Sequence, residues 1–143
     1  MSSHDQTNPG AARDVRAELI DAALAILHED GLDKLTLRRV AARVGVSHAA
    51  PAHHFRGLPH LLGALCGIGF EALSDEMEAG MAAAGDNPRE RLLAVCEAYV
   101  AYAEANPGLI SLMFNAGKER VEKAAFGGSG QRAYTILREG CAP

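Results

Sequence analysis

The sequence predicts an all-helical protein, and three observations support that prediction. The chain is rich in apolar residues, at 48%, and alanine, the strongest helix former, is abundant among them. No stretch alternates apolar and polar residues for long enough to indicate a strand. Glycines and Asn-Pro pairs divide the chain into segments with helical spacing. At 143 residues, the chain has room for one domain or for a small head with a larger body.

The first helix is expected from Arg13 to Asp30. Gly31 follows it and supplies the residue that commonly ends a helix. The residues before it are polar, so we expect a disordered segment over 1–12 without a secretory signal. Apolar residues that recur at helical spacing should face inward, and they are Val15, Leu19, Ala23, Ile26 and Leu27.

Two short helices separated by a glycine turn are expected between residues 36 and 55. Thr36 can cap the first, Gly45 can end it in the left-handed conformation, and Ser47 can cap the second. This order is typical of a helix-turn-helix, whose second helix places its opening residues in the major groove of DNA. The buried stripe expected on the first of these helices consists of Leu37, Val40, Ala41 and Val44.

The distribution of charge favours a nucleic-acid partner, although the net charge of −4 alone does not. Residues 34–60 hold five Lys or Arg, four His and no carboxylate, whereas residues 61–143 carry the whole acidic excess. Arg38 and Arg39 lie in the first turn of their helix, where a cation is unfavourable unless an anion faces it, and a DNA phosphate would be that anion. Arg43 fits a surface ion pair as well as a DNA contact.

Four further helices are expected in the rest of the chain. The first runs over 58–84, and the next two, over 88–105 and 107–116, each begin with an Asn cap followed by Pro. Residues 126–131 have the composition of a flexible loop, and 131–139 begin a last helix with little room to pack. The long helix contains glycines that we expect to allow close helix packing or to form a hinge, namely Gly63, Gly67 and Gly69.

Three segments of the chain follow the order helix, glycine, threonine cap, helix, glycine turn, serine cap and closing His-Phe. They are AELIDAALAILHEDGLDKLTL over 17–37, RRVAARVGVSHAAPAHHF over 38–55, and the pair Leu61-Leu62 that begins the next helix. Together they resemble the DNA-binding domain of the TetR family of transcriptional repressors. ANPGLISLMF, over 105–114, is similar to the ligand-binding body of one TetR subgroup.

The resemblance implies an architecture and a function. It implies a three-helix helix-turn-helix DNA-binding head over 13–57, followed by a helical ligand-binding and dimerisation body over 58–143 that is truncated relative to the family. The expected function is that of a ligand-responsive transcriptional regulator that binds double-stranded operator DNA as a homodimer. The resemblance implies that this regulator is a repressor. The effector is an unknown small molecule, and no cofactor is expected. The family dimerises through two long helices at the end of the body, and we expect the second to be absent from this sequence and the first to be barely begun. Two alternatives follow: the chain is a fragment, or its dimer uses other surfaces.

The resemblance also implies which residues contact DNA. His48, Ala49 and Ala50 stand where the family's recognition helix contacts base edges, because histidine can hydrogen-bond guanine or adenine and alanine can pack on the thymine methyl. Thr36 and His54 match positions that usually touch the phosphate backbone. The whole expected DNA-binding set is Thr36, Arg38, Arg39, Arg43, Ser47, His48, Ala49, Ala50, His53 and His54.

Two positions depart from the family pattern. Ala52 stands where the family usually has a tyrosine that braces a phosphate, and Leu58 stands where it often has a lysine. Both departures remove contacts that position the protein on the DNA backbone. We therefore expect operator binding that is weaker or more sensitive to salt than is usual for the family.

The ligand site implied by the resemblance would lie between the helices of the body. Its apolar and aromatic residues also fit an ordinary helical core, because Met and Tyr at helical spacing most often serve packing. The residues expected to line it are Phe70, Met77, Cys96, Tyr99 and Met113.

Two alternatives stay open at this point. One is a helical interaction module that binds protein in place of DNA. The other is a metal site built from His53, His54, His60 and Cys66, although these residues lack the spacing of common metal motifs. No catalytic constellation stands out, so we expect no enzyme. Three cysteines without pairing rhythm favour the cytoplasm, and the most apolar run, over 61–70, is too short to span a bilayer.

Overall fold

The computed structural model describes residues 13–115 and 129–141, and all secondary-structure elements in this part of the chain are helices, which confirms the predicted fold class. Two short 3-10 helices, η1 (Leu32–Lys34) and η2 (Ala50–His53), accompany the α-helices. The α-helices are α1 (Val15–Asp30), α2 (Leu37–Val44), α3 (Leu58–Ala83), α4 (Pro88–Ala105), α5 (Pro107–Asn115) and α6 (Ser129–Gly140).

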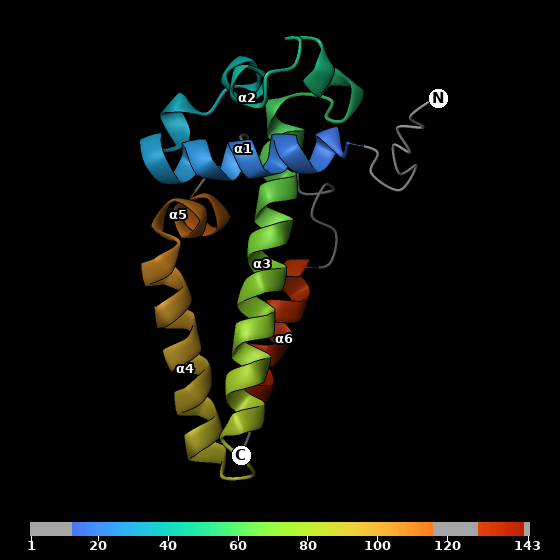
Figure 1. Cartoon of the computed structure of the whole chain (residues 1–143). Coiled ribbons are helices and arrows are strands. Elements are labelled where there is room, and N and C mark those ends of the chain that lie inside the picture. Colours follow the sequence, from blue (N-terminus) through green and yellow to red (C-terminus); the bar gives the residue numbers. More distant parts are fainter. Residues whose placement is uncertain (1–12, 116–128, 142–143) are drawn as a thin grey trace, which may run out of the picture.

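The helices form a head at one end of α3 and a body along the rest of it (Figure 1). In the head, α1 crosses α3, and α2 and η2 lie on the outer side of α1. In the body, α4 and α6 pack along α3. The short helix α5 lies between these parts and contacts both α1 and α3.

Local caps set the helix boundaries, which is why most of them agree with the prediction. The carboxylate of Asp14 accepts a hydrogen bond from the Ala17 N–H (3.1 Å), so α1 begins at Val15, two residues later than expected. Asn87 caps α4 through its side-chain oxygen, and α4 spans the predicted residues 88–105. The predicted end of α5 at residue 116, the segment 1–12 and the start of the 126–131 loop lie outside the described residues.

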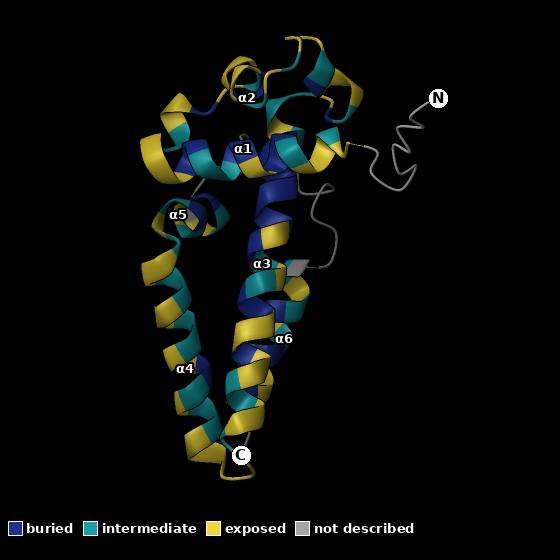
Figure 2. Ribbon diagram, viewed as in Figure 1, coloured by how far each residue is buried: buried dark blue, intermediate teal, exposed yellow. Residues whose placement is uncertain are grey.

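The core of the head includes the first turns of α3. Leu61 and Leu65 of α3 are fully buried in the same cluster as Leu19 of α1 and Val40 of α2. Figure 2 shows this buried stretch of α3 where it passes the head. Leu112 of α5 joins the cluster, so the head is packed against residues from later segments of the chain.

A second cluster forms the core of the body and includes α6. Ala133 and Ile136 of α6 are buried against Leu73 and Met77 of α3 and Val95 of α4. The prediction that the last helix has little room to pack is therefore wrong. Helix α6 also begins at residue 129, two residues earlier than expected, so the predicted loop does not extend over 129–131.

An arginine of α6 adds polar contacts to this apolar packing. The guanidinium of Arg132 donates hydrogen bonds to Glu71 (2.6 Å), Asp75 (2.9 Å) and Glu78 (2.8 Å), which share one face of α3. The hydrogen bonds to these carboxylates raise the pKa of Arg132 above its ordinary value. Arg132 therefore holds α6 against α3 as a permanent cation.

Two glycines allow helices to approach closely. A side chain on Gly69 of α3 would collide with Met113 of α5 and approach Leu109, which confirms the close packing predicted for this glycine. Gly108 of α5 lies against the backbone of α1, where an added Cβ would stand 2.8 Å from the carbonyl oxygen of Leu27. These contacts join α5 to the body and to the head.

Candidate nucleic-acid interface

The helix-turn-helix begins as predicted, with α2 and its glycine turn. The Thr36 hydroxyl accepts a hydrogen bond from the Arg39 N–H (3.1 Å) and caps α2. Gly45 follows with a left-handed backbone (φ 83°), and its N–H and that of Val46 donate to the carbonyl of Ala41. The chain then leaves α2 and enters residues 47–54, which we call the turn segment.

The second helix of the motif differs from the prediction. The expected α-helix capped by Ser47 is in fact a turn followed by the 3-10 helix η2, whose N-cap is Ala49 and which has no side-chain cap. The reason is Pro51, which has no N–H to donate and whose ring would clash with the carbonyl four residues earlier in an α-helix. That carbonyl belongs to Ser47, and it accepts from the Ala50 N–H (3.0 Å) across three residues.

The turn segment has one buried and one exposed side. Pro51 is buried in the head, and so is Phe55, which follows the segment. Ala50 and His54 are half-buried. The side chains that face solvent and are free to meet a partner are Ser47, His48, Ala49, Ala52 and His53.

Phe55 holds the end of the turn segment in place. The guanidinium carbon of Arg16 lies 5.3 Å from the centroid of its ring, and the His60 ring meets it edge-on at 5.8 Å. The Nδ1 atom of His60 also accepts a hydrogen bond from the Arg56 N–H (3.0 Å). His60 therefore serves the fold at the start of α3.

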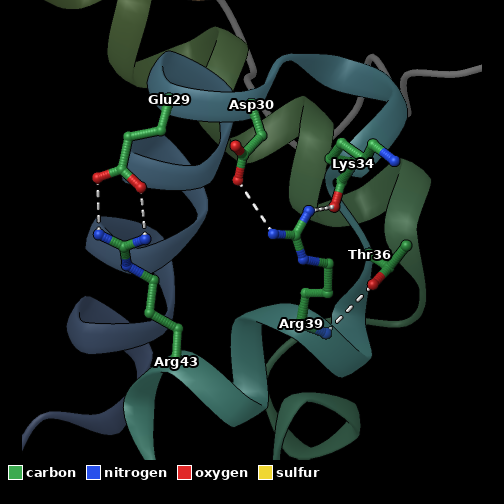
Figure 3. A network of polar contacts seen from close by, with 6 residues as sticks. All are labelled: Glu29, Asp30, Lys34, Thr36, Arg39 and Arg43. Atoms are coloured by element: carbon green, nitrogen blue, oxygen red, sulfur yellow. Dashed lines mark hydrogen bonds and ion pairs between the residues drawn. The ribbon is translucent and has the colours of Figure 1, made fainter.

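Two of the predicted DNA-contacting arginines are paired with carboxylates of α1 (Figure 3). Arg43 donates to both oxygens of Glu29, at 2.7 and 2.9 Å, and Arg39 donates to Asp30 at 3.0 Å and to the Lys34 carbonyl at 3.0 Å. The hydrogen bond from Arg43 lowers the pKa of the Glu29 carboxyl. The strip that lacks acids in sequence is thus partly neutralised in space.

These pairs change the argument made from the helix dipole. The anion that faces Arg39 in the first turn of α2 is Asp30, so a phosphate is not required to explain that arginine. Arg38, its neighbour, is exposed and makes no ion pair with any residue in the described part of the chain. Of the two arginines in this turn, Arg38 is the one whose charge is available to an external anion.

The body contains an apolar groove of about 540 Å³ between α3, α4, α5 and α6. Three of the predicted ligand-site residues line it, namely Phe70, Cys96 and Tyr99. The Phe114 ring stands edge-on to Phe70 (centroids 5.4 Å apart) and to Tyr99 (6.2 Å). Phe114, whose aromatic surface the sequence also assigned to the body site, lines the groove as well. The lining residues that the sequence prediction did not include are Leu73, Val100, Gly130, Ala133, Tyr134 and Leu137.

The other two predicted ligand-site residues have different surroundings. Met77 is fully buried in the core of the body, and Met113 packs between the two core clusters and against Gly69. The lining residues missed by sequence come largely from α6, because that helix was not expected to pack. Their signal was the apolar spacing of Ala133 and Leu137.

Two residues of the alternative metal site, His60 and Cys66, serve the fold. Cys66 is buried in the core of the head, with its Sγ 3.9 Å from the Leu112 carbonyl, and burial raises the pKa of its thiol to about 11. Within residues 13–115 and 129–141, no group of three His, Cys, Asp or Glu side chains could hold a metal ion. No helix in the same ranges has the length and apolar character needed to cross a membrane.

The fold and these two sites define a class: an all-helical protein that carries a helix-turn-helix head on a helical body with an apolar groove. Residues 19–65 match the family model described as bacterial regulatory proteins, tetR family. This match spans most of α1, the helix-turn-helix and the start of α3. The chain therefore carries, over residues 19–65, a domain of the tetR family of bacterial regulatory proteins.

Individual relatives support the same assignment. The HTH-type transcriptional regulator BetI of Yersinia pestis (strain Pestoides F) is 34% identical over 83 residues, which cover 57% of this chain and 42% of the relative. BetI of Burkholderia thailandensis is 40% identical over 83 residues, with 58% and 43% covered. The chain thus spans about two fifths of the length of these curated relatives.

Solved structures share the fold over more of their length. A protein of unknown function from Rhodococcus sp. RHA1 is 33% identical, with a TM-score of 0.77 over 92% of this chain and 70% of the other. The TetR family transcriptional regulator PfmR from Thermus thermophilus is 22% identical, with a TM-score of 0.66 over 85% and 67%. At that identity, the likeness to PfmR concerns the fold alone.

Proposed function

We propose that this protein is a transcriptional regulator, and specifically a repressor, that binds operator DNA through its helix-turn-helix. The observation that carries the proposal is the family match over residues 19–65, because it covers the residues that fold as the helix-turn-helix. The exposed histidines His48 and His53 on the turn segment support it further. Double-stranded operator DNA is the partner, and the cytoplasm is the compartment.

In this proposal the turn segment enters the major groove. The imidazoles of His48 and His53 contact base edges, and the small methyl groups of Ala49 and Ala52 allow the turn segment to approach the bases closely. Arg38 at the start of α2 contacts a phosphate, and the Thr36 hydroxyl, whose oxygen caps α2, still has a proton to donate to another. A homodimer would place two such heads on two half-sites of one operator.

The test for DNA binding is selection of bound sequences from a random duplex pool, followed by affinity measurements across a salt series. His48→Ala and His53→Ala should each weaken binding to the selected site by roughly fivefold or more, because each removes one base contact. His28→Ala, at the far end of α1, is the matched control and should bind like the native protein. If no duplex is retained at low salt by protein of confirmed oligomeric state, the interaction-module alternative replaces this proposal.

We also propose that the groove in the body binds the effector, as an uncharged apolar molecule. The lining residues carry no charged side chain, and their polar atoms are the hydroxyls of Tyr99 and Tyr134 and the thiol of Cys96. Such a surface favours a ligand that is held by burial of apolar area and aromatic contact. Val100 lines the groove on α4, and its 52% exposure makes it a tolerant site for a test substitution.

A neutral fluorescent probe, N-phenyl-1-naphthylamine, can test the groove directly. Val100→Glu places a carboxylate in the groove and should abolish the probe's fluorescence increase. Leu93→Glu is the control, because Leu93 lies on the same helix with a similar 56% exposure but does not line the groove. Equal probe binding by the two variants would contradict the assignment of this groove.

A further inference from the structure

We infer that Pro51 determines which base pairs the turn segment can contact, because it holds this segment in a 3-10 conformation. The inference rests on the proposed function, since it concerns how the same helix-turn-helix meets DNA. Pro51 itself is not one of the residues that face a partner, because its ring is buried in the head. Its role would be to position the residues around it.

The backbone contacts of the turn segment follow from this proline. In an α-helix that starts after Ser47, the N–H of residue 51 would donate to the Ser47 carbonyl, but proline has none. Instead, the Ala50 N–H donates to the Ser47 carbonyl (3.0 Å), and the Ala52 N–H donates to the Ala49 carbonyl (3.2 Å). Both bonds span three residues, which is the 3-10 spacing.

The proline also anchors the segment at its carbonyl. The Pro51 oxygen accepts from the N–H groups of His54 (3.0 Å) and Phe55 (2.9 Å). Phe55 is in turn held by Arg16 and His60. The conformation of residues 50–53 is thus fixed from inside the head, while the exposed side chains of Ala52 and His53 project from it.

The two helical forms present His53 differently. Three residues advance a 3-10 helix by one full turn, whereas they advance an α-helix by about 300°, so His53 would rotate by roughly 60° relative to Ala50. At a side-chain radius of about 5–6 Å, this rotation displaces the imidazole by roughly 5–6 Å. A base-pair step is only about 3.4 Å. The choice of helix form therefore changes which base pair the imidazole can reach.

The test compares the native chain with Pro51→Ala, which restores an N–H and removes the ring. Pro51→Leu keeps an apolar side chain for the buried position and serves if the alanine variant does not fold. Pro88→Ala, at the exposed first position of α4, is the matched control for loss of a proline. Each chain is used to select sites from the same random duplex pool, and amide hydrogen exchange reports whether residue 51 has gained a protected N–H.

The expected result is a protected amide at residue 51 and a changed site for both Pro51 variants. Each variant should prefer its own site over the native one by at least about fivefold, while Pro88→Ala selects the native site. Selection of the native sequence by both Pro51 variants, with native DNA binding intact, overturns this inference alone. Absence of DNA binding by the native chain overturns the proposed function, and this inference falls with it.

Discussion

The guanidinium of Arg43 and the carboxylate of Glu29 form two parallel hydrogen bonds, 2.7 and 2.9 Å long, that join α2 to the end of α1. Bidentate pairs of this kind combine charge with fixed geometry. One turn away, Arg39 and Asp30 form a second link between the same helices. The head therefore uses two of its cations to hold its own helices together, and any phosphate that binds Arg39 or Arg43 must compete with these carboxylates.

Replacing one of the acids should strengthen DNA binding. Glu29→Gln removes the negative partner of Arg43 and leaves that arginine free to contact a phosphate. We expect affinity for duplex DNA at low salt to rise several-fold, and the slope of log affinity against log salt to steepen by up to about one. Glu104→Gln, on the exposed face of α4, changes net charge equally and is the control. An effect of equal size in both variants would point to net charge alone.

The same pair makes a prediction for the pH dependence of stability. Because Arg43 lowers the pKa of Glu29 in the folded protein, this carboxyl binds a proton less readily when folded than when unfolded. The stabilisation is present above the ordinary glutamate pKa and is lost as pH falls through the lowered folded value. The difference in melting temperature between the native chain and Glu29→Gln should therefore shrink as pH falls from 7 towards 3. A difference independent of pH would show that the pair does not stabilise the head.

Arg132 should matter for the attachment of α6. Arg132→Gln leaves the carboxylates of Glu71, Asp75 and Glu78 facing one another without a cation, so the melting temperature should fall by roughly 2–4 °C. The loss should be larger at low salt, because ions screen both attraction and repulsion. Arg138→Gln is the control, since Arg138 is exposed on the same helix and makes no ion pair within the described residues. Equal melting temperatures for both variants would contradict this role.

Gly108 should not tolerate a larger residue. Gly108→Ala places a Cβ 2.8 Å from the Leu27 carbonyl oxygen, and because that atom belongs to the backbone, α5 must shift. Overpacking of this kind costs about 1–3 kcal/mol in the free energy of unfolding, which chemical denaturation can measure. Ser111→Ala, exposed on the same helix, controls for the change in helix propensity. If Gly108→Ala is as stable as the control, the contact between α5 and the backbone of α1 can be widened at little cost in free energy.

The three cysteines should differ sharply in reactivity. Burial raises the pKa of Cys66 to about 11, so at pH 8 it is a thiol without access to reagents, whereas Cys96 and Cys141 are exposed. Iodoacetamide should label Cys96 and Cys141 in the folded protein and reach Cys66 only after unfolding. Mass spectrometry of the labelled peptides measures this order. Rapid labelling of Cys66 in folded protein would show that the head opens readily.

Sequence predicted best the features that depend on neighbours along the chain. Asn87 directly precedes Pro88 at the start of α4, and Thr36 directly precedes Leu37 at the start of α2 and accepts from the N–H of Arg39. Both helix starts can therefore be predicted from adjacent residues. Gly45 was predicted to end α2 in the left-handed conformation, and its φ of 83° confirms this. These are local hydrogen bonds and local dihedral preferences.

Features that depend on distant segments were missed. A surface ion pair was one of the two roles expected for Arg43, and the structure contains it. The acid-free run over residues 34–60 did not show that Glu29 and Asp30, on another helix, would supply the carboxylates. The burial of α6 depends on α3 and α4, which no count of its own residues reveals. Pro51 is a different case, since its signal was local: the prediction relied on Ser47 as a cap and did not take the proline into account.

Because the first turns of α3 complete the interior of the head, the helix-turn-helix head of this molecule cannot be separated from α3. A fragment that stopped at Gly57 would expose the apolar surface that Leu61 and Leu65 now cover, and it would aggregate or remain unfolded. A minimal binding fragment must therefore include α3, which contributes to the cores of both head and body, and must replace the contacts of α5. The same holds for a chimera that joins this head to another sensor domain.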